Sequence, residues 1–184
     1  MHNLLLRIKM IIKKCDLSHL NMLTDFYTEV VDYLVKTVNY PRWTPGVYPC
    51  EQSIEKAIKN GFQYGAFDLN GNILGAFVFN DDPDGNYDVG DWNITLKSGE
   101  YMVIHTLATS IDSYGKGVAT KMVNFCIDKA KKSGYKAIRL DVVPDNYPAI
   151  KLYQKCGFVF AGEKDLQRGF EHIPTFCLYG IDFA

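Results

Sequence analysis

Seven consecutive residues have the composition of a phosphate-binding turn. They run from Tyr114 to Thr120 and read Tyr-Gly-Lys-Gly-Val-Ala-Thr. Gly115 and Gly117 let the backbone turn so that its N–H groups converge. An amphipathic helix follows directly, and the positive end of its dipole favours an anion such as a pyrophosphate. An isolated Gly-x-Gly more often only shapes a strand-to-helix turn, so the neighbouring elements decide between the two interpretations.

The segments around this turn predict a strand, a helix and a second strand. Residues 100–108 alternate in the manner of a strand, apolar residues recur at helical spacing from residue 117 to residue 134, and residues 136–143 are expected to form another strand. Such a unit implies a parallel strand pair with a right-handed connection. Earlier in the chain, Asn70-Gly71 between two apolar runs predicts an antiparallel hairpin. We therefore expect an α/β fold with a mixed sheet.

Further patterns predict the elements that surround this unit. Helices are expected after Asp16 or Ser18, over residues 51–60 and between Asn146 and Gly157, and strands are expected near residues 11–12, 92–96, 158–162 and 175–181. Residues 39–50 contain three prolines, which exclude regular structure there. The aromatic side chains of this loop, Trp43 and Tyr48 among them, either line a pocket or cover the core.

The composition limits the function. The 184 residues suffice for one domain, assigned to residues 11–184, with residues 1–10 as a leader whose role the sequence does not specify. A net charge of -1 lacks the basic excess of nucleic-acid-binding proteins, and no apolar run is long enough to span a membrane. Five scattered cysteines form no Cys-x-x-Cys pair, which favours the reducing cytoplasm and argues against zinc. The acidic loop at residues 80–90 lacks the later glutamate of a calcium loop, so no metal is expected.

The order of elements and two motifs resemble the GNAT superfamily of acyl-CoA-dependent N-acyltransferases over nearly the whole chain. The family's phosphate motif is Arg/Gln-x-x-Gly-x-Gly/Ala, and residues 114–119 match it except that Tyr114 replaces Arg or Gln. A second characteristic stretch is similar to Asn146-x-x-Ala149-x-x-Leu152-Tyr153-x-x-x-Gly157-Phe158. A P-loop does not fit, because Gly117 stands where Ser or Thr should bind magnesium. A dinucleotide fold lacks its third glycine.

The resemblance implies a single GNAT-like domain whose mixed, mostly antiparallel sheet contains a splayed parallel strand pair and is flanked by helices. Acetyl-CoA would lie between the splayed strands. Its pantetheine amides would pair with Leu107, Ala108 and Thr109 in the manner of an added strand. The resemblance assigns the pyrophosphate to the N–H groups of the turn, that is, to Tyr114, Gly115, Lys116, Gly117, Val118, Ala119 and Thr120. Lys116 and Lys121 would add charge, and Asn146 would bond the cofactor, cap its own helix, or do both.

Direct acyl transfer to an amine needs a neutral nucleophile, a stabilised oxyanion and a proton for the departing thiolate. Tyr153 occupies the position at which many GNAT enzymes carry a tyrosine acid, with core packing as its alternative role. For the base, His105 is the best side chain, because an imidazole with a reference pKa of about 6.5 accepts a proton at neutral pH. A water chain or Glu100 competes for that role. We also expect His105 and Leu107 to share one face of their strand.

The acceptor is expected to be a primary amine of a small molecule or a peptide. Tyr33, Trp43 and Tyr48 are assigned to its pocket, which would favour a partly apolar or aromatic acceptor. A different class of function also fits the fold, namely a non-catalytic acyl-CoA-binding sensor, and Tyr114 at the first motif position keeps this alternative open. A homodimer is expected only by analogy with the family.

Overall fold

The computed structural model describes residues 9–183, so the expected leader over residues 1–10 lies almost entirely outside the described part. The strands are β1 (Ile11–Lys14), β2 (Gln63–Phe67), β3 (Ile73–Asn80), β4 (Tyr101–Thr109), β5 (Ala137–Val142), β6 (Val159–Lys164) and β7 (Phe176–Asp182). The helices are α1 (Leu20–Lys36), α2 (Glu51–Lys59), α3 (Val118–Lys132) and α4 (Tyr147–Lys155), with short 3-10 turns at Leu17–His19, Tyr87–Val89 and Ile111–Ser113.

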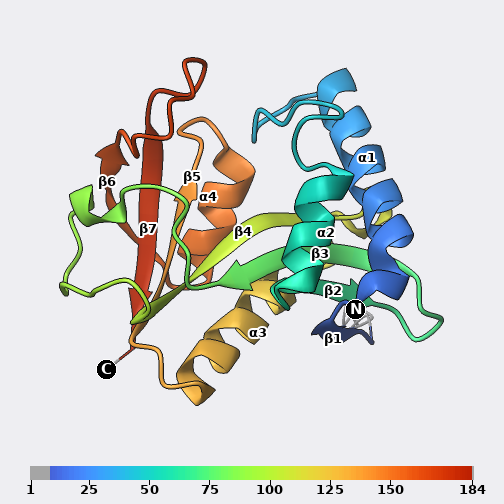
Figure 1. Cartoon of the computed structure of the whole chain (residues 1–184), viewed down its shortest axis with the longest axis horizontal. Coiled ribbons are helices and arrows are strands. Elements are labelled where there is room, and N and C mark those ends of the chain that lie inside the picture. The colour runs from blue at the N-terminus through green and yellow to red at the C-terminus, as the bar shows by residue number, and fades with distance from the viewer. Residues whose placement is uncertain (1–8, 184) are drawn as a thin grey trace, which may run out of the picture.

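The strands of the described part form one sheet in the order β1-β2-β3-β4-β5-β7-β6 (Figure 1). Only β4 and β5 pair in parallel, and every other neighbouring pair is antiparallel. This confirms the mixed, mostly antiparallel sheet with one parallel pair. The expected hairpin is also confirmed, because β2 and β3 pair across Asn70-Gly71, and Gly71 has a positive φ of 86° that suits glycine.

Helices cover the two faces of the sheet differently. On one face, α3 and α4 pack over the sheet centre around Met122, Cys126, Ile138, Leu140 and Tyr153. On the other face, α1 and α2 cover the side of β1 to β4, while the loop between β3 and β4 covers the side of β5 to β7. The middle of this second face therefore lies between two separate coverings (Figure 1).

The loop between β3 and β4 corrects one expectation. Residues 92–96 form no strand, and Trp92 and Leu96 instead belong to the apolar cluster that covers one face of the sheet. Trp92 packs onto the sheet, and the guanidinium of Arg139 lies between the rings of Trp92 and Tyr101, at 4.3 and 4.5 Å from their centroids. Gly90 and Gly180 make room for Trp92, since a Cβ on either would clash with its ring.

In the described chain, no helix is long and apolar enough to cross a membrane.

Candidate active site

The parallel strands β4 and β5 separate after a short stretch of pairing. Their pairs end at Val103 opposite Arg139, although β4 continues to Thr109 and β5 to Val142. The outer edges of both strands stay paired, β4 with β3 and β5 with β7. Beyond Val103 and Arg139, the facing edges therefore offer backbone groups without a strand partner. An extended ligand with amide groups can pair with such an edge.

A β-bulge determines which groups of β4 face this divergence. Ala76 pairs with Ala108 but Val78 with His105, so β4 carries one extra residue between them. Thr106 lies in this bulge with a positive φ of 49°, and its carbonyl accepts a hydrogen bond from the Tyr27 hydroxyl at 2.9 Å. The bulge reverses the side-chain alternation. The expectation that His105 and Leu107 share a face is therefore wrong: Leu107 packs against the core on the α3 side.

The three residues expected to hold the pantetheine differ in what their backbones can offer. The Ser110 N–H donates to the Leu74 carbonyl at 2.9 Å. Because hydrogen-bonded and non-bonded pairs alternate along antiparallel strands, Ala108 also directs its backbone groups to β3. Leu107 and Thr109 direct theirs away from β3, toward the divergence. These two residues, rather than Ala108, can pair with a ligand there.

The glycine turn presents free donors at the start of α3. Gly115 and Gly117 both have positive φ, 73° and 78°, as the turn requires. Tyr114 and Lys116 use their N–H groups inside the turn, on the carbonyls of Ile111 and Ser113 at 3.2 Å each. Within residues 9–183, the N–H groups of Gly115, Gly117, Val118, Ala119 and Thr120 have no acceptor. This donor set fits a pyrophosphate, but Tyr114 and Lys116 cannot contribute their N–H groups as expected.

Replacing Gly117 with alanine tests this turn. A Cβ at Gly117 would meet no protein atom within 4 Å, so the space it enters is the space open to a ligand. We expect calorimetry to show about tenfold weaker binding of acetyl-CoA. The free energy of unfolding should fall by about 1 kcal/mol, because alanine is strained in the left-handed conformation.

Gly134→Ala is the matched control. Gly134 follows the other end of α3, with a φ of 81° and the same open space. The stability loss should be similar and the affinity for acetyl-CoA unchanged. Equal affinity losses in both variants would show that the turn has no special part in binding.

Asn146 begins α4 on the side of β5. Its side-chain oxygen accepts the N–H of Ala149 at 3.3 Å, so the helix-capping role is present. A contact of Asn146 with the cofactor stays a prediction. The side chain of Lys116, the other polar candidate at this end of the site, is exposed to solvent.

Tyr153 lies on the inner face of α4, where it is 6% exposed and packs against Phe158 at 5.5 Å between ring centroids. Its hydroxyl has no hydrogen-bond partner among the described residues, although it is a donor that burial normally forces to find one. Burial raises the pKa of Tyr153 well above its usual value, so the phenol stays protonated at neutral pH. A protonated, unengaged hydroxyl has the properties of an available proton donor.

His105 projects from β4 on the opposite face, just past the last β4–β5 pair. Its Nε2 lies 3.0 Å from the side-chain oxygen of Asn80 and 2.9 Å from the carbonyl oxygen of Asp82. Burial lowers the pKa of His105 below 6.5, so the ring is neutral at pH 7. Glu100, the competitor for the base, lies at the other end of β4 and pairs with Lys136. Among acidic and basic side chains on β4, His105 alone is near the divergence.

Asp141 and Arg168 form an ion pair beside His105 that the sequence interpretation missed. Asp141 occupies the β5 position level with His105, and its carboxylate accepts from Arg168 Nη1 and Nη2 at 2.9 and 2.7 Å. The Tyr87 hydroxyl donates to the same carboxylate at 2.5 Å. The one signal in the sequence was a carboxylate between two apolar residues, Leu140 and Val142, of an expected strand, because a carboxylate in such a place usually has a partner. Its partner lies 27 positions away.

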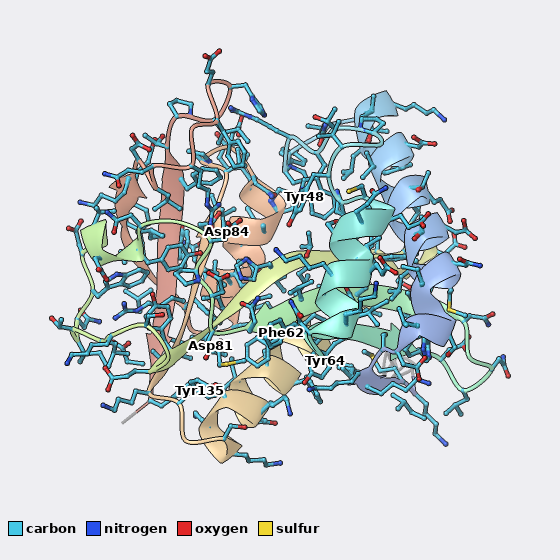
Figure 2. All side chains as sticks on the ribbon, in the orientation of Figure 1. Tyr48, Phe62, Tyr64, Asp81, Asp84 and Tyr135 are labelled. Carbon is cyan, nitrogen blue, oxygen red and sulfur yellow. The ribbon has the colours of Figure 1, made fainter. Side chains whose placement is uncertain are left out.

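The aromatic residues expected to bind the acceptor separate into two places. Trp43 and Tyr48 pack edge to face at 6.4 Å, and Trp43 also contacts Tyr27. Tyr48 is 43% exposed as a residue, but its hydroxyl is desolvated beside Thr106 and Asp84, which raises its pKa to about 12. In Figure 2, Tyr48 lies in the loop between α1 and α2, and Asp84 lies in the loop between β3 and β4. The Tyr48 hydroxyl therefore lies beside Thr106, the neighbour of His105 on β4, and Trp43 lies behind it against Tyr48.

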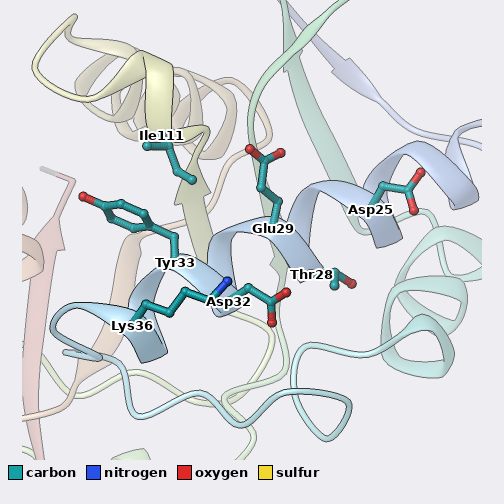
Figure 3. Close-up of a pocket in the computed structure, with 7 residues that line it drawn as sticks. All are labelled: Asp25, Thr28, Glu29, Asp32, Tyr33, Lys36 and Ile111. Carbon is teal, nitrogen blue, oxygen red and sulfur yellow. The ribbon is translucent and has the colours of Figure 1, made fainter.

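Tyr33 lies elsewhere, on the exposed side of α1. Its ring packs against Tyr114 of the glycine turn at 5.9 Å. It faces Ile111 across a hollow of about 460 Å³ that is lined mainly by polar residues of α1 (Figure 3). A second hollow, of about 240 Å³, lies between α1 and the segment before α2. Neither hollow includes a residue of the β4–β5 divergence, so the strand geometry, rather than hollow size, marks the candidate site.

The sequence of residues 26–158 matches the acetyltransferase (GNAT) family. The chain belongs to this family. Over 100 residues it is 34% identical to a streptothricin acetyltransferase of Escherichia coli, covering 54% of this chain and 48% of that protein. Over 79 residues it is 32% identical to an uncharacterized N-acetyltransferase of Methanocaldococcus jannaschii, covering 43% and 34%. The chain thus matches about half or less of the length of these relatives.

Solved GNAT structures have the same fold. A GNAT-family acetyltransferase from Streptococcus agalactiae superposes with a TM-score of 0.78 over 95% of this chain and 96% of its own, at 19% identity. The family that this chain belongs to is described as acetyltransferases, so the site is compared with the needs of acyl transfer. The divergence of β4 and β5, the glycine turn and α4 are the parts of the fold available for it. In the described part of the chain, no three His, Cys, Asp or Glu side chains gather as metal ligands.

Proposed function

We propose that this GNAT protein is an enzyme that transfers the acetyl group of acetyl-CoA to a primary amine. The observation that carries the proposal is the separation of β4 and β5 after Val103 and Arg139, next to a turn with five unpaired N–H groups. A strand edge with free amide groups and a helix start with free donors fit a ligand that has amides at one end and a pyrophosphate at the other.

In this proposal the backbone of the chain positions the cofactor and two side chains move protons. The N–H groups of the glycine turn hold the pyrophosphate, and Leu107 and Thr109 pair with the amides. Acetyl-CoA supplies an activated thioester. His105 accepts a proton from the ammonium form of the acceptor through its unpartnered Nδ1, directly or through water. The neutral amine would then form a bond to the thioester carbonyl carbon, and the C–S bond would break. Tyr153 would donate the proton that the departing thiolate requires, and the second proton lost by the nitrogen would restore the phenol.

Supporting this division of labour, the two side chains have complementary protonation states. His105 is neutral because burial lowers its pKa, and Tyr153 is protonated because burial raises its pKa. A base and an acid with such separated pKa values are both in the working form at neutral pH. His105 and Tyr153 lie on opposite faces of the sheet, and the divergence of β4 and β5 is where the faces connect.

The acceptor class remains part of the proposal. Tyr48 lies beside Thr106 with Trp43 packed against it, and the two offer an aromatic surface for the acceptor, whereas Tyr33 would contact the cofactor side through Tyr114. A small molecule or a peptide amine fits this arrangement. Because one relative is a streptothricin acetyltransferase, streptothricin belongs in any panel of acceptors. A homodimer and a cytoplasmic location stay predictions.

The test combines calorimetric titration with acetyl-CoA and thiol release against a panel of amines that includes streptothricin, polyamines, amino acids and short peptides. Binding with release of CoA and a mass increase of one acetyl group on an amine would support the proposal. Binding without transfer to any amine would favour the acyl-CoA sensor instead. Absence of binding would show that the β4–β5 divergence does not receive acetyl-CoA.

A further inference from the structure

The two acceptors around His105 determine which ring nitrogen carries its proton. Nε2 faces the Asp82 carbonyl, which can only accept, and the side-chain oxygen of Asn80. The orientation of the Asn80 amide is itself determined, because its oxygen also accepts the Asp82 N–H at 3.2 Å. Nε2 is therefore the N–H donor in the neutral ring. Nδ1 keeps the lone pair and has no partner among the described residues.

Arg168 holds the loop that supplies these acceptors. This arginine comes from the segment between β6 and β7, and its Nη2 donates to the Pro83 carbonyl at 3.1 Å. Its Nε donates to the carbonyl of Asp84. The other side of the same guanidinium binds the carboxylate of Asp141 on β5. One side chain thus connects the loop directly after Asp82 to the strand that lies level with His105.

The backbone on both sides of this contact adopts conformations that need support. Asp84 and Gln167 have positive φ values of 47° and 58°, which non-glycine residues seldom adopt. Gly85 allows the close approach, since a Cβ there would lie 2.9 Å from Arg168 Nε and 3.2 Å from the Leu166 carbonyl. The Asn86 N–H also donates to that carbonyl at 3.0 Å. Strained residues persist where surrounding contacts determine their conformation.

We propose that Arg168 is a positioning residue for catalysis: by clamping the Pro83–Asp84 carbonyls to Asp141, it holds Asp82 and Asn80 against Nε2 of His105 and so keeps Nδ1 as the base. The role of Nδ1 rests on the proposed function, whereas the clamp and the tautomer can be tested without it. Arg168 itself touches no reacting atom in this scheme. Its effect on the reaction passes through the loop.

The charged and titratable groups that face His105 come from four different segments of the chain. Asp141 approaches from β5, Arg168 from the β6–β7 segment and Asp84 from the β3–β4 loop. The hydroxyl of Tyr48 from the loop before α2 lies near the same three groups. Asp141 and Asp84 favour the protonated imidazole, and Arg168 opposes it. Loss of the Arg168 charge removes a group that lowers the pKa of His105, whereas loosening of the Asp82 contact removes a hydrogen bond that raises it. Because these two effects on the pKa oppose each other, the tautomer is the decisive readout.

Nuclear magnetic resonance of the ligand-free protein tests the clamp directly. Long-range ¹H–¹⁵N spectra distinguish a protonated Nε2 from a protonated Nδ1, and a pH titration of the same signals gives the pKa. In the wild type we expect the Nε2–H tautomer and a pKa below 6.5. In Arg168→Met the Nε2–H tautomer should become mixed with the Nδ1–H tautomer, because the loop that carries Asp82 is no longer held. Arg168→Lys retains the charge but not the planar, five-donor guanidinium, so its tautomer should also become mixed.

Lys164→Met is the matched control. Lys164 on β6 pairs with Asp91 of the same β3–β4 loop at 3.0 Å, but it does not contact the Pro83–Asp84 carbonyls. Its removal should leave both the tautomer and the pKa of His105 unchanged. If Arg168→Met fails to fold, Arg168→Lys and Asn80→Ala, which removes one acceptor without touching the clamp, still report on the tautomer.

Kinetics then connect the clamp to the reaction. At pH 7, kcat/KM should fall by at least about twofold in Arg168→Met, because a smaller fraction of the rings carries the lone pair on Nδ1, and should not change in Lys164→Met. A wild-type His105 with the Nδ1–H tautomer, or Arg168 variants that leave the tautomer unchanged, would overturn the positioning role. Normal spectra with no amine acetylated by the wild type would instead count against the proposed function and leave the clamp intact.

Discussion

Replacing Tyr153 by phenylalanine should lower kcat by about 100-fold or more while the dissociation constant for acetyl-CoA changes less than about twofold. General acid catalysis contributes on the order of 10²–10⁴ in rate, and a proton donor acts in the transition state rather than in the ground-state complex. Steady-state thiol release gives kcat, and calorimetry gives the affinity. The melting temperature should stay equal or rise slightly, because the hydroxyl that is lost has no hydrogen bond in the described structure.

Tyr64→Phe provides the matched control for this change. Tyr64 belongs to the same core as Tyr153 but lies on β2, three strands away from β5 in the sheet. Its hydroxyl likewise has no hydrogen-bond partner among the described residues. The substitution should leave kcat within about twofold of the wild type. If Tyr153→Phe also keeps full turnover, the core-packing role of Tyr153 is sufficient and another group or water must protonate the thiolate.

The second large effect is expected on stability, from Asp141→Asn. The Asp141–Arg168 pair is nearly buried, with side chains that are 14% and 12% exposed. Neutralising Asp141 leaves a guanidinium buried without its counter-charge. Breaking a buried pair in this way costs about 3–5 kcal/mol. Urea denaturation at pH 7 should therefore show a loss of about 3 kcal/mol in the free energy of unfolding, since the asparagine oxygen still accepts one hydrogen bond.

Asp145→Asn tests whether burial of the ion pair causes the stability loss expected in Asp141→Asn. Asp145 pairs with Arg42 through both carboxylate oxygens, at 3.2 and 3.1 Å, but these side chains are 55% and 37% exposed. An exposed pair of this kind contributes less than about 1 kcal/mol. The double variant Asp141→Asn with Arg168→Met should recover part of the stability lost in Asp141→Asn alone, because it also removes the unpaired charge. Equal losses in Asp141→Asn and Asp145→Asn would contradict the buried-pair explanation.

The parts of this protein that depend on local sequence could be predicted. The hairpin at Asn70-Gly71 follows from a turn that requires positive φ, and α3 follows from apolar residues repeated at helical spacing. The glycine turn needs Gly115 and Gly117 for the same backbone reason. The family resemblance rested on motifs that are contiguous in the chain. Each of these signals lies within a short segment, so no knowledge of distant contacts was needed.

The chemistry around His105 depended on contacts that the sequence does not encode locally. The bulge at Thr106 comes from the pairing of β4 with β3, and it moved Leu107 away from the face of His105. Whether a strand contains a bulge depends on its partner's register, which simple alternation cannot show.

The sequence by itself determined the elements, their order and the family, because helical periodicity, turn chemistry and contiguous motifs act over a few residues. Tertiary structure alone decided the tautomer of His105 and the buried pairing of Asp141 with Arg168. These features join β3, β5 and two loops that are far apart in the chain. Their stability comes from desolvation and converging hydrogen bonds, which exist only after the sheet has brought those segments together.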